Sequence, residues 1–355
     1  MVEKIKVAIV DDSLFIRTIL SDMLASDPEI EVVGTAKDGN EAVSLVEKKK
    51  VDVVTMDIVM PRMNGIEALE KIMGMKKPPS VLMLSAADRA SADNVMKSLD
   101  IGAFDFILKP VSTSSTDILR LKWEILSKIK AAFKSEWKRA PQECIEDLKA
   151  PALKQEAKGA TSYGRVIAIG SSTGGPVALR YILACMPGTM PAPIVIAQHM
   201  PKAFTESFAE RLDKKTDIKI KEAKDGDVLK DAVAYIGPGD RHMRIFCNDK
   251  RKLEVAFEEG GRIQGGRPSA DLLLTSAAEA AGNMAVGIIL TGMGSDGAKG
   301  IKKIKEVGGF TIAQDEGTSL VWSMPHSAIK LGVVDKVLPL KDIPHAILSK
   351  LGVRV

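Results

Sequence analysis

One serine of the chain stands in a turn that is typical of a catalytic nucleophile. Gly170, Ser172 and Gly174 match the pattern Gly-x-Ser-x-Gly, between a strand-like run at 166–169 and a helix-like stretch at 177–183. Such a strand-to-helix turn projects the serine hydroxyl at the start of the helix. Glycine-rich turns also hold phosphates, but the lysine that a P-loop places after its glycines is missing. A nucleophilic serine and a structural turn both remain open on this evidence.

A nucleophilic serine needs a base, and the chain contains four histidines, which are His199, His242, His326 and His345. His199 comes two residues after the strand-like run at 194–197, at the same sheet edge as the serine, whereas His242 falls in a predicted hairpin and is the poorer candidate. Asp296, in a glycine-rich segment after a later strand, could orient the histidine or simply cap the next helix. The order Ser, His, Asp differs from that of α/β-hydrolases but is compatible with triad chemistry.

Carboxylates and a lysine indicate a second site in the first third of the chain. Asp11 and Asp12 follow the strand-like run at 6–10, Asp57 follows the run at 51–56, Ser85 follows the run at 81–84 and Lys109 follows the run at 104–108. The carboxyl ends of parallel strands converge, so these groups should share one pocket. Like charges repel there, and a divalent cation such as Mg²⁺, which takes oxygen ligands, would relieve the repulsion. A metal ion and an ammonium group beside a carboxylate favour phosphoryl transfer to it.

The spacing of apolar residues predicts two α/β domains that position these groups. Strand-like runs alternate with amphipathic stretches in the first third, at 6–10, 51–56, 81–84 and 104–108. The alternation resumes later, with runs at 166–169, 194–197, 285–290 and 309–313. Such alternation predicts parallel sheets with helices on both faces. Within 232–257, apolar runs at 235–236, 243–246 and 253–257 lie between turn residues, which predicts an inserted antiparallel hairpin. The expected fold class is therefore α/β, with two doubly wound parallel-sheet domains.

A helical linker is expected between the two domains. Apolar residues keep a helical period from about residue 116 to 137, beyond the length that one domain needs. Two prolines and a Lys/Glu/Ala-rich composition then indicate a connector. The expected organisation is a first domain at 1–122, a linker at 123–160 and a second domain at 161–355.

The composition excludes several classes of protein. The 355 residues are 45% apolar and 27% charged, which is ordinary for globular domains. Three cysteines without metal-ligand spacing predict neither a disulfide framework nor a zinc ribbon. There is no signal-peptide core and no apolar run of bilayer length, so a cytoplasmic protein without membrane insertion is expected. The net charge of +4 comes without an arginine-rich stripe, so no nucleic-acid partner is expected.

The motifs of the first domain resemble those of response-regulator receiver domains. The resemblance rests on Val-Asp-Asp-Ser at 10–13, Met-Asp-Ile-Val-Met-Pro at 56–61, Leu-Ser-Ala at 84–86 and Leu-Lys-Pro at 108–110. It implies that a histidine kinase phosphorylates Asp57 and that the three aspartates hold Mg²⁺. It also implies that Ser85 and Lys109 bind the phosphoryl oxygens. Phe104 is taken as the position of the switch tyrosine of many receivers, so only the aromatic part of that switch is expected.

The motifs of the second domain resemble those of chemotaxis protein-glutamate methylesterases, the CheB family. They are Ile-Gly-Ser-Ser-Thr-Gly-Gly-Pro at 169–176, Gln-His-Met-Pro at 198–201, Gly-Pro-Gly-Asp-Arg-His-Met at 237–243, Arg-Pro-Ser-Ala-Asp at 267–271 and Leu-Thr-Gly-Met-Gly-Ser-Asp-Gly at 290–297. The receiver in front matches the domain order of that family, so the resemblance spans almost the whole chain. Small departures are Ser171, where alanine is usual, and Asp240, where glycine is frequent.

The resemblance implies a triad of Ser172 as nucleophile, His199 as base and Asp296 as the residue that orients the base. The backbone N–H of Met293 is the candidate donor to the oxyanion. The implied reaction removes methyl groups from glutamate methyl esters on the cytoplasmic helices of chemoreceptors and releases methanol; deamidation of receptor glutamines would use the same acyl route. A chemotaxis histidine kinase is the implied phosphodonor, and the ester hydrolysis itself is expected to need no cofactor.

The domain order further implies regulation, in which the unphosphorylated receiver blocks the esterase and phosphorylation of Asp57 relieves the block. A competing hypothesis is that the second domain is a non-catalytic binding module, whose segment 170–175 holds an anion at a helix N-terminus. Replacement of Ser172 by alanine distinguishes the two, because only an esterase would lose its activity.

Overall fold

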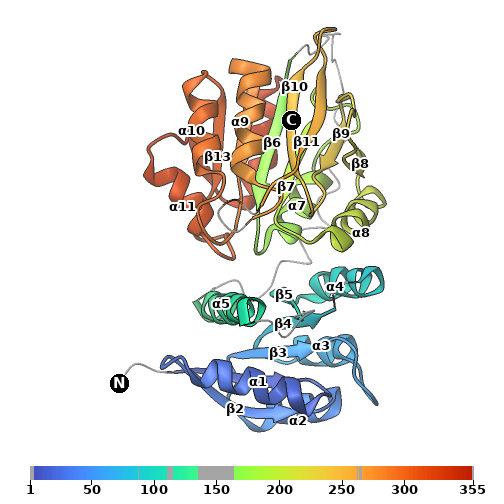
Figure 1. Ribbon diagram of the computed structural model, residues 1–355, viewed down its shortest axis with the longest axis vertical. Coiled ribbons are helices and arrows are strands. Elements are labelled where there is room, and N and C mark those ends of the chain that lie inside the picture. The colour runs from blue at the N-terminus through green and yellow to red at the C-terminus, as the bar shows by residue number, and fades with distance from the viewer. Residues whose placement is uncertain are drawn as a thin grey trace. The chain divides into compact units, whose positions relative to one another are not determined.

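The structure is a computed structural model that describes residues 4–86, 88–109, 115–134, 164–261, 263 and 266–353. The chain separates into two compact units, with the division between residues 140 and 141. Each unit is built around a parallel β-sheet with helices packed on it (Figure 1). The prediction of two α/β domains with parallel sheets is confirmed.

The sheet of the first unit has the strand order β2-β1-β3-β4-β5. Its strands are β1 (Ile5–Val10), β2 (Ile30–Ala36), β3 (Val53–Asp57), β4 (Ser80–Ser85) and β5 (Asp105–Leu108). Its helices are α1 (Leu14–Ala25), α2 (Gly39–Lys48), α3 (Gly65–Met73), α4 (Arg89–Ile101) and α5 (Ser115–Lys134). Helix α1 contacts α5, whereas α2, α3 and α4 contact one another in series. Both faces of the sheet are thus covered, which explains the unbroken apolar runs of its inner strands.

Helix α5 continues well beyond the length that covers β5. Ile125 and Ile129 in its second half are fully buried, and Lys128 forms an ion pair of 3.0 Å with Asp105 of β5. These contacts attach the second half of α5 to the first sheet. The remainder of the expected linker, residues 135–160, lies outside the described residues.

The sheet of the second unit has the strand order β14-β13-β12-β6-β7-β9-β8, and every pair in it is parallel. Its strands are β6 (Val166–Ser171), β7 (Ile194–Gln198), β8 (Lys219–Glu222), β9 (Val233–Ile236), β12 (Ala285–Ile289), β13 (Phe310–Gln314) and β14 (Lys336–Leu338). Its helices are α7 (Gly175–Ala184), α8 (Lys202–Asp213), α9 (Ala270–Ala281), α10 (Ala298–Glu306), α11 (Ser323–Lys330) and α12 (Ile343–Lys350), with 3₁₀ turns at Gly282–Met284 and Leu340–Asp342. Helices α9 and α10 pack on the central strands β12 and β6.

The predicted hairpin is present but shorter than expected. It consists of β10 (His242–Cys247) and β11 (Leu253–Glu258), which pair antiparallel. The assignment of 235–236 to this hairpin is wrong, because these residues belong to β9, a parallel strand between β7 and β8. Glycine and proline at 237–239 end the strand in either arrangement, so they do not reveal which partner it takes. The hairpin packs against α9 through buried Met243 and Ile245.

Within the described part of the chain, no helix combines the length and the apolarity that crossing a bilayer requires.

Candidate active site and phosphorylation site

The candidate triad residues lie at the carboxyl ends of neighbouring strands of the second sheet. Ser172 follows β6, His199 follows β7 and Asp296 lies in the loop after β12. Strand β6 has β7 on one side and β12 on the other. The strands β7, β9 and β8 extend the sheet toward one edge, and β12, β13 and β14 extend it toward the other. Such a switch point opens a crevice between the two loops that diverge there. The fold therefore places these three residues at one edge of the sheet, at the ends of the adjacent strands β12, β6 and β7.

The turn that carries Ser172 depends on close backbone packing. Its N–H donates to Thr291 O over 3.0 Å, which ties it to the loop after β12. Gly174 begins α7 at a φ of +77°, a conformation that favours glycine, and a Cβ there would lie 2.6 Å from Leu320 Cβ. Ser172 itself remains partly exposed. The hydroxyl is thus held at a helix start and is accessible to a substrate.

His199 lies beside Ser172 because β6 and β7 pair in register. Ser171 is opposite Gln198, and the His199 N–H donates to Ser171 O over 3.0 Å. The His199 Nε2 lies 2.8 Å from Asp296 Oδ2. A carboxylate only accepts hydrogen bonds, so Nε2 carries the proton and Nδ1 is left as the basic nitrogen. The structure thereby joins His199 to Asp296 and places the His199 backbone beside the Ser172 turn.

Asp296 is fully buried at the N-terminus of α9, where several groups donate to its carboxylate. Ala270 N–H donates to Oδ2 over 2.8 Å, while Asp271 N–H and Ser269 Oγ donate to Oδ1 over 2.9 Å each. Burial alone would raise the pKa of Asp296, but the hydrogen bond and charge of His199 and the backbone donors lower it below its ordinary value. The side chain is therefore a carboxylate at neutral pH.

The loop after β12 approaches Ser172 through glycine. A Cβ on Gly292 would lie 2.8 Å from Ser172 Cβ, so only glycine fits. The N–H groups on either side of Met293 are engaged, since Gly292 donates to Val321 O and Gly294 donates to Ser323 Oγ. Among the described residues, the Met293 N–H has no such acceptor. This is the state that an oxyanion donor needs before substrate binds.

Gln198 is a functional residue that the sequence analysis missed. Its Nε2 donates to the carbonyls of Ser172 over 2.9 Å and of His199 over 3.1 Å, so one side chain holds both backbones. Its Oε1 accepts from Ser171 Oγ over 2.7 Å, which engages the hydroxyl that replaces the usual alanine. A Cβ on Gly175 would lie 2.0 Å from this Oε1. The signal in the sequence was a glutamine that directly follows an apolar strand and precedes the candidate base.

His242, the poorer candidate base, is not available for proton transfer. Its Nδ1 accepts from Ser269 N–H over 3.1 Å, and its Nε2 lies 2.8 Å from Gly261 O. Both nitrogens are therefore occupied by backbone groups, and the ring is 1% exposed. His199 alone of these two histidines can serve Ser172.

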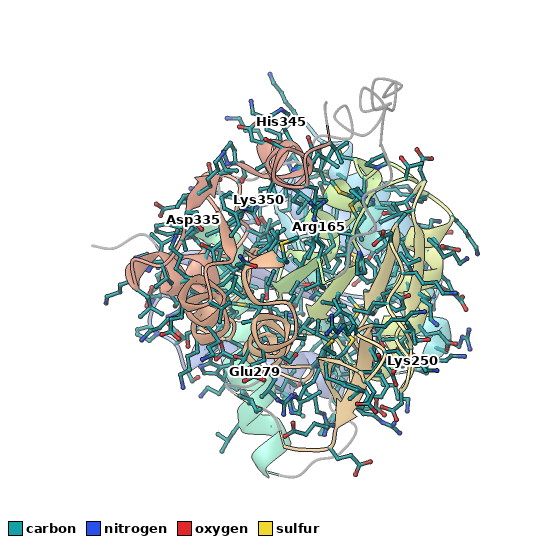
Figure 2. All side chains as sticks on the ribbon, turned by 90° about the horizontal axis from the view of Figure 1, so that it is seen from above. Arg165, Lys250, Glu279, Asp335, His345 and Lys350 are labelled. Carbon is teal, nitrogen blue, oxygen red and sulfur yellow. The ribbon has the colours of Figure 1, made fainter. Side chains whose placement is uncertain are left out.

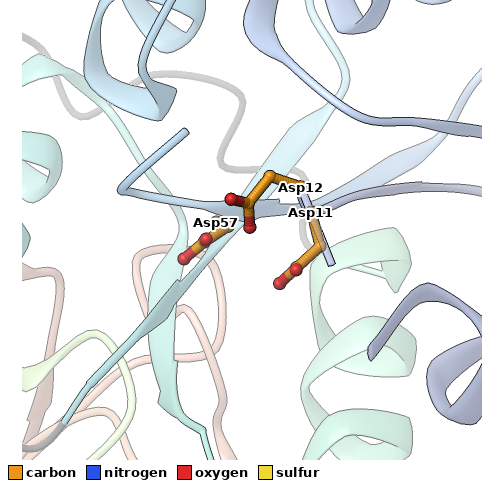
Figure 3. A group of neighbouring side chains, drawn as sticks. All are labelled: Asp11, Asp12 and Asp57. Carbon is orange, nitrogen blue, oxygen red and sulfur yellow. The ribbon is translucent and has the colours of Figure 1, made fainter. Parts of the chain in front are cut away.

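The carboxylates of the first unit converge as predicted (Figure 3). One oxygen each of Asp11, Asp12 and Asp57 can be chosen so that all lie within 4.8 Å of one another. Lys109 Nζ lies 2.7 Å from Asp11 Oδ2 and 2.9 Å from Asp57 Oδ2. Asp11 and Asp57 are buried, while Asp12 is exposed. Three carboxylates around one point are an oxygen set suited to a divalent cation.

The pKa values at this site show the cost of gathering the charges. Burial raises the pKa of Asp57, the contacts with Lys109 lower it less, and the charges of Asp11 and Asp12 raise it further. Burial would lower the pKa of Lys109, but hydrogen bonds to Asp11 and Asp57 raise it. The single ammonium group of Lys109 is shared between the Oδ2 atoms of Asp11 and Asp57. An additional cation would stabilise this group, which agrees with the donor set.

The structure places Ser85 beside Lys109 but does not bring Phe104 to them. Ser85 pairs with Leu108, and the Lys109 N–H donates to Ser85 O over 2.8 Å. Phe104 lies at the opposite end of β5, where its N–H donates to Val81 O over 2.8 Å. Four residues of extended chain separate Phe104 from Leu108, which is about 13 Å. Phe106, also buried, is the aromatic residue nearer to Lys109 along the strand.

The fold and the two sites define a two-domain response regulator whose second domain carries the residues of a serine hydrolase. The response regulator receiver domain matches residues 7–118, and the CheB methylesterase domain matches residues 167–347. The chain belongs to the CheB family of protein-glutamate methylesterases and protein-glutamine glutaminases.

Relatives from archaea are similar over nearly the whole chain. A protein-glutamate methylesterase/protein-glutamine glutaminase of Pyrococcus horikoshii is 44% identical, and the match covers 98% of this chain and 94% of the relative. A protein of the same description from Methanococcus maripaludis is 42% identical, with 98% of both chains covered. The crystal structure of the Thermotoga maritima CheB methylesterase catalytic domain is 42% identical, with a TM-score of 0.51, and covers 52% of this chain and 98% of that chain.

Proposed function

We propose that this protein hydrolyses glutamate methyl esters of chemoreceptors, with release of methanol, and deamidates receptor glutamines. The observation that carries the proposal is the buried Asp296 carboxylate on His199 Nε2, which leaves the other imidazole nitrogen as a base at the Ser172 turn. The full-length similarity to proteins of that description supports the substrate class.

The geometry supports acyl transfer in two steps. His199 Nδ1 takes the Ser172 hydroxyl proton as Oγ forms a bond to the ester carbonyl carbon. The Met293 N–H stabilises the oxyanion, and the imidazolium passes its proton to the leaving methoxide, so that methanol departs. Water then attacks the acyl-enzyme with His199 again as base, which releases the glutamate carboxylate and restores Ser172. With a glutamine amide the leaving group is ammonia.

The experiment that tests this function measures the products of a methylated receptor fragment. We expect the intact, phosphorylated chain to release methanol and leave glutamate carboxylates. A fragment with glutamine at the same positions should yield ammonia. A phosphorylated chain that yields neither product would contradict the proposal, and so would methanol release that does not depend on Ser172.

We further propose that Asp57 accepts a phosphoryl group from a chemotaxis histidine kinase, with Ser85 and Lys109 as ligands of its oxygens. Asp11, Asp12 and Asp57 would hold Mg²⁺, which supplies positive charge to the phosphoryl oxygens when bound. The convergence of these side chains supports this role. For the aromatic part of the switch, the positions in β5 favour Phe106 over Phe104. The proposed setting is the cytoplasm, where the receptor helices and the kinase meet the chain.

Removal of divalent cations should separate the two sites. We expect EDTA to abolish labelling of Asp57 by a small phosphodonor, because the carboxylate cluster loses its counter-charge. Basal methanol release should not change, since its proposed residues include no metal ligand. Phosphate incorporation and methanol are measured on the same samples, with Asp57→Asn as the unlabelled control. Equal labelling with and without EDTA would contradict the proposed metal site.

The receiver should lower the activity of the unphosphorylated chain. We expect a fragment of residues 161–355 to release methanol faster than the intact unphosphorylated chain, and phosphorylation of Asp57 to raise the rate of the intact chain toward that of the fragment. Initial rates at equal active-enzyme concentration provide the comparison, and intact Asp57→Asn should not respond to the phosphodonor. Equal rates for fragment and intact chain would show that the receiver exerts no block.

A further inference from the structure

His242 is a buried histidine that bridges two backbone segments beside the active site. Ser269 N–H approaches Nδ1 to 3.1 Å, and Gly261 O lies 2.8 Å from Nε2. A backbone N–H can only donate and a carbonyl can only accept, so Nδ1 is the acceptor and Nε2 carries the proton. The ring is thus neutral with both nitrogens satisfied. Such a side chain fixes the distance between the two segments that it joins.

The first of these segments is the start of α9, which holds the catalytic carboxylate. Ser269 precedes the helix, and its hydroxyl donates to Asp296 Oδ1 over 2.9 Å. The N–H groups of Ala270 and Asp271 donate to Asp296 Oδ2 and Oδ1 over 2.8 and 2.9 Å. Any displacement of this helix start would therefore move the carboxylate that pairs with His199.

The second contact is with Gly261, five residues before a glycine that lies against the His199 ring. That glycine, Gly266, exchanges two backbone hydrogen bonds of 2.9 and 3.0 Å with Ile263. A Cβ on Gly266 would lie 2.2 Å from His199 Nε2 and 2.5 Å from Cε1. The backbone at Gly266 therefore packs closely against the imidazole. His242 holds the chain at Gly261, shortly before this contact.

We propose that His242 is a positioning residue for the Asp296–His199 pair. Through Ser269 it holds the helix start that binds the carboxylate, and through Gly261 it holds the chain shortly before Gly266, which packs against the imidazole. It transfers no proton. The inference rests on the proposed function, because its effect is measured through ester hydrolysis.

Three substitutions separate the two contacts. His242→Asn keeps an amide oxygen near the position of Nδ1, so it can accept from Ser269. His242→Gln keeps an amide nitrogen near the position of Nε2, so it can donate to Gly261. His242→Leu removes both contacts. We expect kcat for methanol release to fall about 10²-fold with leucine, as for a misplacement of about 1 Å, and less with asparagine or glutamine. KM should stay within about twofold, since His242 contacts no substrate.

A double-mutant cycle with Asp296→Asn distinguishes positioning from general destabilisation. If His242 acts through the Asp296–His199 pair, His242→Leu should cost little more once Asp296 is already asparagine. A role in folding alone would give losses that add, with kcat falling in proportion to the folded fraction measured by circular dichroism. His345→Asn is the control, because His345 is exposed on α12 (Figure 2) and should keep the wild-type rate.

The outcomes separate this inference from the proposed function. Wild-type kcat in His242→Leu, or additive losses in the cycle, would overturn the positioning role. If His242→Leu does not fold, the test rests on His242→Asn and His242→Gln. Wild-type rates in both of these variants would also overturn the positioning role. Equal methanol release by wild type and Ser172→Ala would instead contradict the proposed function, whatever the His242 variants do.

Discussion

Ser172→Ala is expected to lower methanol release from methylated receptor by on the order of 10⁴-fold or more. The substitution removes the oxygen that forms the acyl-enzyme, so His199 and the oxyanion donor have no nucleophile to serve. The Ser172 side chain contributes little to the stability of the fold, because the hydrogen bonds of this residue to Thr291 and Gly175 are formed by its backbone. The variant should therefore fold normally and still bind the substrate. Initial rates and trapping of the acyl-enzyme measure the loss.

Ser171→Ala is the matched control for this prediction. It removes the neighbouring hydroxyl, which donates to Gln198 Oε1 and not to the substrate. A loss of less than about tenfold is expected, the effect of one neutral hydrogen bond of about 1 kcal/mol. If Ser172→Ala kept the activity of this control, Ser172 would not be the nucleophile, and the anion-binding hypothesis would gain support.

Asp296→Asn is expected to cost about 10⁴-fold, by analogy with the corresponding change in serine proteases. An asparagine cannot accept on both sides, so its amide nitrogen would face either His199 or the α9 donors. With the amide toward His199, the imidazole must accept at Nε2, and its proton moves to Nδ1 on the side of Ser172. The base is then lost although the fold is kept.

Asp335→Asn controls for the loss of a hydrogen-bonded carboxylate elsewhere in the same sheet, at an exposed residue. Asp335, labelled in Figure 2, accepts from Thr311 N–H over 2.9 Å and pairs with Lys305. Burial would raise its pKa, but these partners lower it, as His199 and the backbone donors do for Asp296. We expect this variant to lose some stability and to keep its kcat. Equal losses of kcat in both variants would indicate a general effect on the fold.

The sequence allowed the sheets and the convergence of the site residues to be predicted, for a physical reason. Strands buried on both faces are unbroken apolar runs, and their carboxyl ends must meet at one edge, as Ser172, His199 and Asp296 do. Edge strands gave weaker signals. β8 has one apolar residue among three charged ones, and β14 is only three residues long; neither was predicted. Strand β9 was assigned to the wrong partner. The turn residues after it show where the strand ends, but they do not show which strand it pairs with.

Contacts that arise only from packing could not be predicted. Gln198 was noted as part of a motif, but nothing local shows that its amide holds two backbones. The bridging role of His242 likewise depends on Ser269 and Gly261, which are distant in sequence. The aromatic position is open in the sequence for a simpler reason, since Phe104 and Phe106 both suit a buried strand and only the register places Phe106 nearer to Lys109.

The central pairing of β6 with β12 has a consequence for how the enzyme becomes active. These strands are joined in register from Ala285 opposite Val166 to Ile289 opposite Gly170, across more than a hundred residues of intervening chain. Closing a loop of this length costs conformational entropy before the pairing stabilises the sheet. The same pairing brings Asp296 to the sheet edge that carries His199. The Asp296–His199 pair therefore exists only in chains in which β12 has joined β6. We expect triad hydrolysis to be absent from any chain that ends before β12, whereas the receiver needs only its own sheet.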